Sequence, residues 1–121
     1  MSKVDTFDVI VVGAGGAGLA AAVAAASDGA EVVVLEKMVQ PGGTTAIAVG
    51  SFTAACTAYQ QRAGIVDAVS DHVEDAGRFA PGDIEGRNNA ELRAWFLGQA
   101  ARTLSWLTEM GRAFHGPSPE Q

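Results

Sequence analysis

Three glycines and one carboxylate are the residues of this chain whose types and spacing could support chemistry. Gly13, Gly15 and Gly18 form a G-x-G-x-x-G pattern directly after a short apolar run. The first glycine permits a tight turn, the second lets the backbone approach a pyrophosphate, and the third allows a helix to pack closely on a strand. Glu36 follows at a distance that suits hydrogen bonds from both ribose hydroxyls of an adenosine, and its charge would repel the 2′-phosphate of NADP. The pattern predicts a dinucleotide-binding site.

The glycines lie between elements that can position them. Val9–Val12 is a β-branched run, which predicts a strand buried on both faces of a parallel sheet. The alanine-rich segment 19–26 predicts a helix that Gly29 ends, and its N-terminus would offer free N–H groups and a partial positive charge to phosphates. The apolar run 32–35 predicts a second strand with Glu36 at its tip. The sequence thus predicts an α/β fold with a parallel sheet.

Structural alternatives compete with this interpretation. The glycines could fall by coincidence in a buried Ala/Gly-rich helix, although the strand, the helix and the acid all occur at the expected positions. Residues 9–27 carry no charge, yet their many glycines and alanines make them too weakly apolar for a good membrane span. Asp5 and Asp8 interrupt the basic region that a signal peptide needs. We therefore expect no membrane span.

Composition limits the partners and the compartment. The chain has 121 residues, enough for one small domain, and 48% of them are hydrophobic, so it can build a core. Its net charge of −6 makes nucleic acid and anionic membrane surfaces unsuitable partners. Cys56 is the single cysteine, which excludes an internal disulfide and indicates the cytoplasm. We expect its thiol to be buried or idle rather than redox-active.

The middle of the chain gives weaker signals. Residues 38–45 contain a proline and a glycine pair, and they predict a loop without regular structure. The hydroxyls of Thr44 and Thr45 could wrap a diphosphate from its other side, or a threonine could simply cap a turn. Residues 46–59 carry no charge, which implies burial or contact with a flat apolar ligand. The polar segment 60–64 predicts another loop.

Two amphipathic helices are predicted in the second half of the chain. Apolar spacing predicts the first over 65–79, with His72 on its surface, followed by a loop over 80–89. The second should run from 90 to 110 with Asn89 as its cap. Its predicted apolar stripe consists of Leu92, Phe96, Ala100, Thr103, Leu104 and Leu107, extended by Trp95 and Trp106. Nothing here resembles a catalytic pair, and no metal site is expected.

Three segments and the last helix resemble one known family, the FAD-dependent oxidoreductases of the fumarate reductase and succinate dehydrogenase flavoprotein type, which includes ketosteroid dehydrogenases. The segments are V-V-G-A-G-G-A-G-L-A-A-A-V-A-A at the first strand, V-V-V-L-E-K at 32–37 and P-G-G-T-T-A-I-A-V-G-S at 41–51. The helix contains W-L-T-E-M-G, similar to the family's W-L-x-x-x-G. The resemblance implies the N-terminal part of a Rossmann-like FAD-binding domain, a parallel sheet with flanking helices.

The resemblance also implies which residues hold FAD. The glycine loop would bind the diphosphate, Glu36 the adenosine ribose, and Lys37 would lie near the adenine. The segment after the second glycine pair would line the path toward the flavin ring. The implied cofactor-binding residues are Gly13, Ala14, Gly15, Gly16, Ala17, Gly18, Glu36, Lys37, Gly43, Thr44, Thr45, Gly50 and Ser51.

Two positions depart from the family pattern. Membrane-bound succinate dehydrogenases carry a histidine, joined covalently to the flavin, where this chain has Thr44. Threonine cannot form that bond, so FAD should be bound non-covalently. The family's Gly-Gly pair is Gly50-Ser51 here, which changes a contact expected near the flavin.

The resemblance implies parts that this sequence lacks. In the family, hydride- and proton-transfer residues lie in a later capping domain, and late strands complete the FAD-binding domain. Residues 1–121 are therefore expected to be a truncated, partial FAD-binding domain, inactive alone, with its catalytic residues unknown. Two strands and a few helices are also expected to leave sheet surface uncovered. A small-molecule substrate, a dicarboxylate or an enone that undergoes hydride transfer at a C–C bond, would bind the absent domain. The alternatives are an NAD-binding dehydrogenase domain and a non-catalytic nucleotide-binding module.

Overall fold

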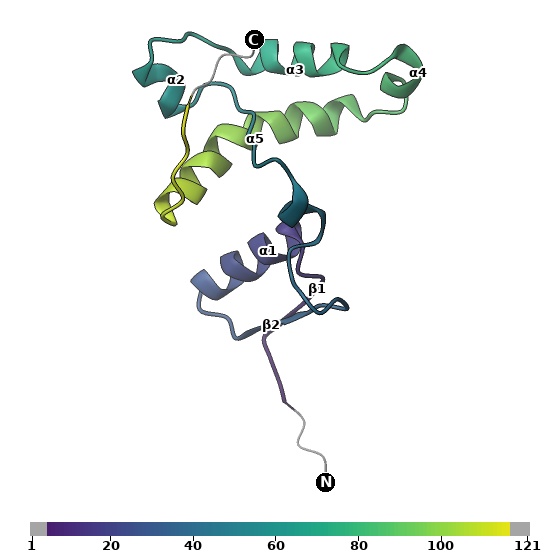
Figure 1. The fold of residues 1–121 in the computed structure, drawn as a ribbon, viewed down its shortest axis with the longest axis vertical. Helices are drawn as coiled ribbons and strands as arrows, with labels where there is room; N and C mark the ends of the chain where they lie inside the picture. Colours follow the sequence, from purple (N-terminus) through teal and green to yellow (C-terminus); the bar gives the residue numbers. More distant parts are fainter. Residues whose placement is uncertain (1–4, 117–121) are drawn as a thin grey trace. The chain divides into compact units, whose positions relative to one another are not determined.

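The computed structural model describes residues 5–116, which fall into two compact units divided between Ser51 and Phe52 (Figure 1). The first unit contains β1 (Val9–Val12), α1 (Gly16–Ser27), β2 (Val32–Leu35) and the short 3-10 helix η1 (Gly43–Ile47). The second unit contains α2 (Ala58–Arg62), α3 (Val69–Arg78), α4 (Gly82–Glu85) and α5 (Ala90–Glu109). The chain is α/β, as predicted, and its predicted cofactor-binding residues all belong to the first unit.

The two strands form a parallel pair, and both have the predicted bounds. Val9 lies opposite Val32, and the register continues to Val12 opposite Leu35. Two hydrogen bonds between Asp8 and Glu31 precede the paired strands. The Asp8 amide donates to the Glu31 carbonyl at 2.9 Å, and the Glu31 amide donates to the Asp8 carboxylate at 2.8 Å. Helix α1 connects the strands and packs against both of them (Figure 1). These bonds and the parallel register bring the carboxyl ends of both strands to the same end of the sheet.

The β-branched run is typical of a strand buried on both faces, but one face of β1 is open, as expected for two strands with few helices to cover them. The exposed fraction is 60% for Ile10 and 83% for Val12, whereas Val9 and Val11 are half-buried. Alternate residues of a strand point to opposite faces, so one face of β1 packs toward α1 and the other meets solvent. A single connecting helix covers only one side of a two-stranded sheet, which leaves this apolar face open within the first unit.

Helix α1 begins three residues before the predicted start. Gly15 is its N-cap with an extended backbone, so the glycine loop runs directly into the helix at Gly16. The helix ends at Ser27, and Gly29 takes a left-handed conformation with φ of +91°, which confirms its predicted role in ending the helix. The alanine-rich sequence tolerates the early start, because it has few side chains that clash in the first turn.

The second unit is built on the contact between α3 and α5, which run alongside each other (Figure 1). Leu97, Ala100 and Leu104 of α5 are buried, together with Ala55. The predicted stripe was partly wrong, because Leu97 was missed and several predicted members are exposed. The exposed members are Leu92, Trp95, Phe96 and Thr103. The helix presents one row to α3 and a second apolar row to solvent, and sequence spacing does not distinguish the two.

Other boundaries in the second unit also differ from prediction. Residues 60–64 were expected to be a loop, but 60–62 belong to α2, which begins at Ala58 after a capping box between Thr57 and Gln60. That T-x-x-Q signal was readable from the sequence. Helix α3 begins at Val69 rather than at 65, and the predicted loop 80–89 contains the short helix α4. Helix α5 has its predicted start, with the Asn89 side chain accepting a hydrogen bond from the Leu92 amide at 2.9 Å.

Candidate dinucleotide-binding site

The glycine loop continues the sheet and then turns into α1. The Gly13 amide donates to the Leu35 carbonyl at 2.7 Å, which extends the strand pairing by one residue. Gly13 then takes φ of +96°, a conformation that favours glycine. Gly18 is required by space, because a Cβ there would lie 1.9 Å from the Gly13 carbonyl oxygen. The first and third glycines of the motif are thus explained by the fold itself.

Gly15 is not explained in this way. Its backbone has φ of −79° and ψ of −179°, which any residue can adopt. A Cβ at this position would meet no atom within 4 Å. A glycine that the fold does not need, at the N-terminus of a helix, leaves room for a group from outside the chain to approach the backbone. The space fits a phosphate group of a dinucleotide.

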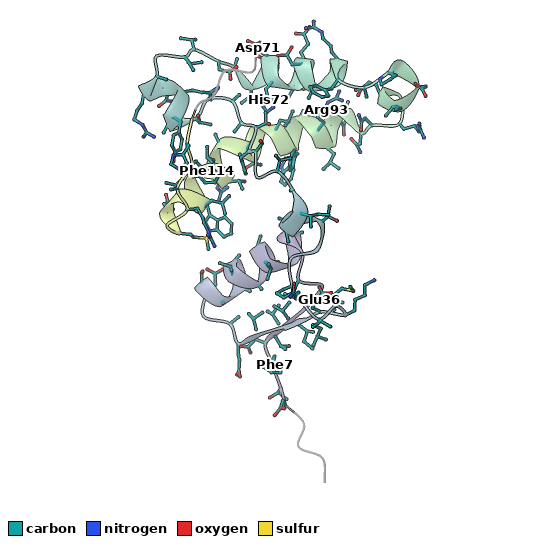
Figure 2. The ribbon with its side chains drawn as sticks, viewed as in Figure 1. Phe7, Glu36, Asp71, His72, Arg93 and Phe114 are labelled. Atoms are coloured by element: carbon teal, nitrogen blue, oxygen red, sulfur yellow. The ribbon has the colours of Figure 1, made fainter. Side chains whose placement is uncertain are left out.

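Glu36 binds the glycine loop through its carboxylate (Figure 2). One oxygen, Oε2, accepts the amide of Ala14 at 2.7 Å, and the other, Oε1, accepts the amide of Met38 at 2.8 Å. These amides, Ala14 first, hold the pKa of Glu36 below its ordinary value. The side chain is half-buried, and each oxygen keeps a lone pair for a ribose hydroxyl. Sequence reasoning missed this contact within the chain.

The segment after Pro41 is fastened to the glycine loop. The Gly42 amide donates to the Ala14 carbonyl at 2.7 Å, and Gly15 and Gly42 form a parallel bridge. Residues 43–47 form η1, so the prediction that 38–45 has no regular structure is wrong for its last part. Thr45 Oγ1 accepts the Gly16 amide at 3.2 Å. Of the two predicted roles for the threonines, capping is therefore seen for Thr45, although the helix that it caps is α1.

The remaining predicted site residues lie on exposed backbone. Lys37, Gly43 and Thr44 are exposed, and they flank the residues that contact the glycine loop. Gly50 and Ser51 are also exposed, and within residues 5–116 no hydrogen bond joins either of them to that loop. The structure therefore brings together the glycine loop, Glu36 and Thr45, and leaves Gly50 and Ser51 outside this set of hydrogen bonds.

The uncharged segment 46–59 is mostly exposed, so its predicted burial is wrong. The exposed fraction is 84% for Ile47 and 100% for Val49. Only Ala55 and Thr57 of this segment are buried. Contact of the segment with a flat apolar ligand stays a prediction.

Two chemistry-bearing side chains of the second unit lie elsewhere than expected. His72 was predicted on the surface, but its Nδ1 is buried without a hydrogen-bond partner, on the side of α3 that faces α5 (Figure 2). The thiol of Cys56 was expected to be buried or idle, and it is exposed and donates to the Asp67 carbonyl at 3.2 Å.

Within the described part of the chain, no three His, Cys, Asp or Glu side chains gather to hold a metal ion. None of the helices between residues 5 and 116 has the length and apolarity to cross a membrane.

Several known proteins are similar to this chain in sequence and in fold. An NADH:fumarate oxidoreductase of Klebsiella pneumoniae is 37% identical over 106 residues, which are 88% of this chain and 11% of that protein. A fumarate reductase (cytochrome) of Shewanella frigidimarina is 35% identical over 107 residues, 88% of this chain and 18% of that protein. The crystal structure of a 3-ketosteroid-delta4-(5alpha)-dehydrogenase from Rhodococcus jostii, solved with 4-androstene-3,17-dione, superposes with a TM-score of 0.74 at 31% identity. That match covers 90% of this chain and 22% of the dehydrogenase.

The chain thus spans between about a tenth and a quarter of the length of these relatives. A family model described as an FAD binding domain matches residues 8–120, which includes both units. The names of these relatives are those of fumarate reductases and a ketosteroid dehydrogenase, the enzyme classes that the resemblance in the sequence implied. With the glycine loop, the parallel strands and Glu36 in place, the chain belongs to the FAD binding domain family of fumarate reductase-like flavoproteins.

Proposed function

We propose that the glycine loop and Glu36 hold the diphosphate and adenosine ribose of FAD in a flavin-dependent oxidoreductase. The observation that carries this proposal is the open space at Gly15, where a Cβ would meet nothing within 4 Å. The N-terminus of α1 faces this loop and adds its unpaired amides and partial positive charge. A diphosphate is the anionic part of FAD, and it matches both the charge and the space.

Each residue near the loop has a role in this proposal. Glu36 accepts the ribose hydroxyls with the lone pairs that its backbone partners leave free. Lys37 lies near the adenine, and Gly43, Thr44, Thr45, Gly50 and Ser51 line the path toward the flavin ring. Bound FAD would supply the redox chemistry, while the chain binds and orients it. Thr44 has no nucleophilic nitrogen for a flavin link, so the cofactor is held non-covalently.

We further propose that substrate binds outside this region. The relatives' names include fumarate and a ketosteroid, which share a C–C bond next to an electron-withdrawing carbonyl or carboxyl group. A dicarboxylate or an enone is therefore the proposed substrate class. Residues 1–121 act as a partial FAD-binding domain, and a capping domain supplies the acid–base residues. The proposal draws support from the small share of each relative that the chain spans. Residues 1–121 alone should not turn over substrate, and a cytoplasmic location stays a prediction.

A cofactor titration tests the proposal. The purified chain is titrated with FAD and separately with NAD, and the complex is then precipitated with acid. We expect saturable FAD binding, weaker binding of NAD, and flavin released into the supernatant. Saturable binding of NAD without FAD would favour a dehydrogenase domain instead. Flavin retained by the denatured chain would contradict non-covalent binding.

A further inference from the structure

Helix α1 has no capping side chain of its own. Its N-cap is Gly15, and its first turn contains no acidic residue. The first amides of a helix have no partner within it, and a Ser, Thr, Asp or Asn at the N-cap normally satisfies one of them. In this structure Thr45, 29 residues away in sequence, supplies the missing acceptor through its Oγ1 at 3.2 Å from the Gly16 amide. A distant segment therefore completes the N-terminus of α1.

The backbone around Thr45 holds it in this place. The Gly42 amide bonds the Ala14 carbonyl at 2.7 Å, and the Ala46 amide bonds the Gly42 carbonyl at 3.2 Å, which starts the η1 turn. A Cβ on Gly16 would lie 2.6 Å from Thr45 Oγ1. Glycine at position 16 thus lets the hydroxyl come within hydrogen-bond distance, which explains the one motif-loop glycine that G-x-G-x-x-G does not specify.

Some backbone amides of the glycine loop donate hydrogen bonds within the chain, and others do not. Three of them are used by the chain: Gly13 donates to Leu35, Ala14 to Glu36 and Gly16 to Thr45. The amides of Gly15, Ala17 and Gly18 take part in none of the hydrogen bonds found within residues 5–116. The used amides thus lie mainly at the start of the loop and the open ones mainly at its end, so the used ones can fix the loop while the open ones face a ligand.

From this division we propose that Thr45 is a positioning residue of the diphosphate site. Its hydroxyl holds the Gly16 amide, fixes the loop, and so leaves the amides of Gly15, Ala17 and Gly18 aligned for phosphate oxygens. This action on the loop, through the Gly16 amide, is a role of Thr45 in addition to lining the path toward the flavin ring. This inference rests on the proposed function, because it assigns the order of the loop to diphosphate binding.

Three variants of the chain test this role. Thr45→Val keeps the side-chain shape and removes the hydroxyl, Thr45→Ser keeps the hydroxyl, and Thr103→Val is the matched control at an exposed threonine of α5, outside the site. We expect Thr45→Val to weaken FAD binding about tenfold, the scale of one hydrogen bond of the upper usual strength. Thr45→Ser should stay within about twofold of the original chain, and so should Thr103→Val. Amide hydrogen exchange at Gly16, measured without FAD, should accelerate in Thr45→Val only.

The outcomes separate the two proposals. If the original chain binds no FAD, the proposed function fails, and the exchange rate at Gly16 still decides whether Thr45 caps α1. If the original chain binds FAD and Thr45→Val binds it equally well, the positioning role is overturned. Failure of Thr45→Ser to restore binding would overturn it too, because the methyl group rather than the hydroxyl would then matter. An equal loss in Thr103→Val would show that removing any exposed threonine hydroxyl weakens binding, and it would also overturn the positioning role.

Discussion

The first unit is held together mainly by its backbone, and the second mainly by its side chains. Around the glycine loop, backbone amides donate hydrogen bonds to Leu35, Glu36 and Thr45. The glycines have no side chains, and this lets the segments approach closely enough for these bonds. In the second unit Leu97 and Leu104 are buried in a helical core. The positions of backbone amide donors are fixed by the backbone itself, so a site made of them is precise. A packed core tolerates many different apolar side chains of similar volume. Substitutions at the loop positions that the fold leaves open should therefore change binding, and substitutions at packed positions of either unit should change stability.

The same division is visible in the ion pair of the second unit. Arg93 pairs with Glu85, and both side chains are mostly buried (Figure 2). The Arg93 guanidinium, together with Asn88, holds the pKa of Glu85 below its ordinary value. A Cβ on Gly77 would lie 3.1 Å from the Arg93 guanidinium, so α3 packs directly on this pair. Here a carboxylate ties helices together, while Glu36 in the first unit also presents its oxygens to an open site.

The largest effect is expected from Gly18→Ala. The added Cβ would lie 1.9 Å from the Gly13 carbonyl oxygen, so α1 must move away from β1. We expect a loss of about 3 kcal/mol in the free energy of unfolding, the upper range for overpacking. Thermal unfolding followed by circular dichroism measures it. Gly15→Ala is the control, because its Cβ meets no atom, and equal melting of the two variants would contradict the close packing at Gly18.

A feature of the fold or the site could be predicted from the sequence where neighbouring residues determine it, and not where it depends on residues far apart in the chain. The bounds of both strands were predicted correctly, because short β-branched runs between turn residues are decided nearby. The start of α1 was missed, since a glycine N-cap gives no capping signal in sequence. The bond from Ala14 to Glu36 joins residues 22 positions apart, and it appears only once the strands are paired. An uncovered sheet surface was expected from the small number of strands and helices, but that Ile10 lies on the open face follows only from where α1 packs.

A second effect should separate the two apolar rows of α5. Leu104 is buried, so Leu104→Ala should lower the free energy of unfolding by about 2–4 kcal/mol through lost contacts and a cavity. Leu92→Ala is the matched control, since Leu92 is 59% exposed and should cost less than about 1 kcal/mol. Urea unfolding of both variants measures this, and FAD affinity should stay unchanged in each. A loss for Leu92→Ala as large as that for Leu104→Ala would support the stripe predicted from sequence, which contains both residues, over the observed packing.

A smaller effect concerns the charge of Glu36. Its pKa is lower in the folded chain, because the amides of Ala14 and Met38 favour the carboxylate. That stabilisation is complete above the ordinary glutamate pKa of about 4.3, and it is lost as the pH falls through the lowered folded value. Melting temperature measured from pH 7 down to pH 3 should therefore drop less in Glu36→Gln than in the original chain. The same variant should bind FAD about tenfold more weakly at pH 7, the scale of one charge-assisted hydrogen bond. Parallel melting curves for both chains would argue against the observed contacts.

The measurement that tests the central claim most directly is the dissociation constant for FAD of Gly15→Val beside that of the original chain. The fold leaves the space at Gly15 empty and its backbone ordinary, so valine should fold there without strain. We predict an unchanged melting temperature and binding weakened at least about 100-fold, because the side chain fills the space of the diphosphate. Equal FAD affinity of the two folded chains would show that the glycine loop is not the phosphate site.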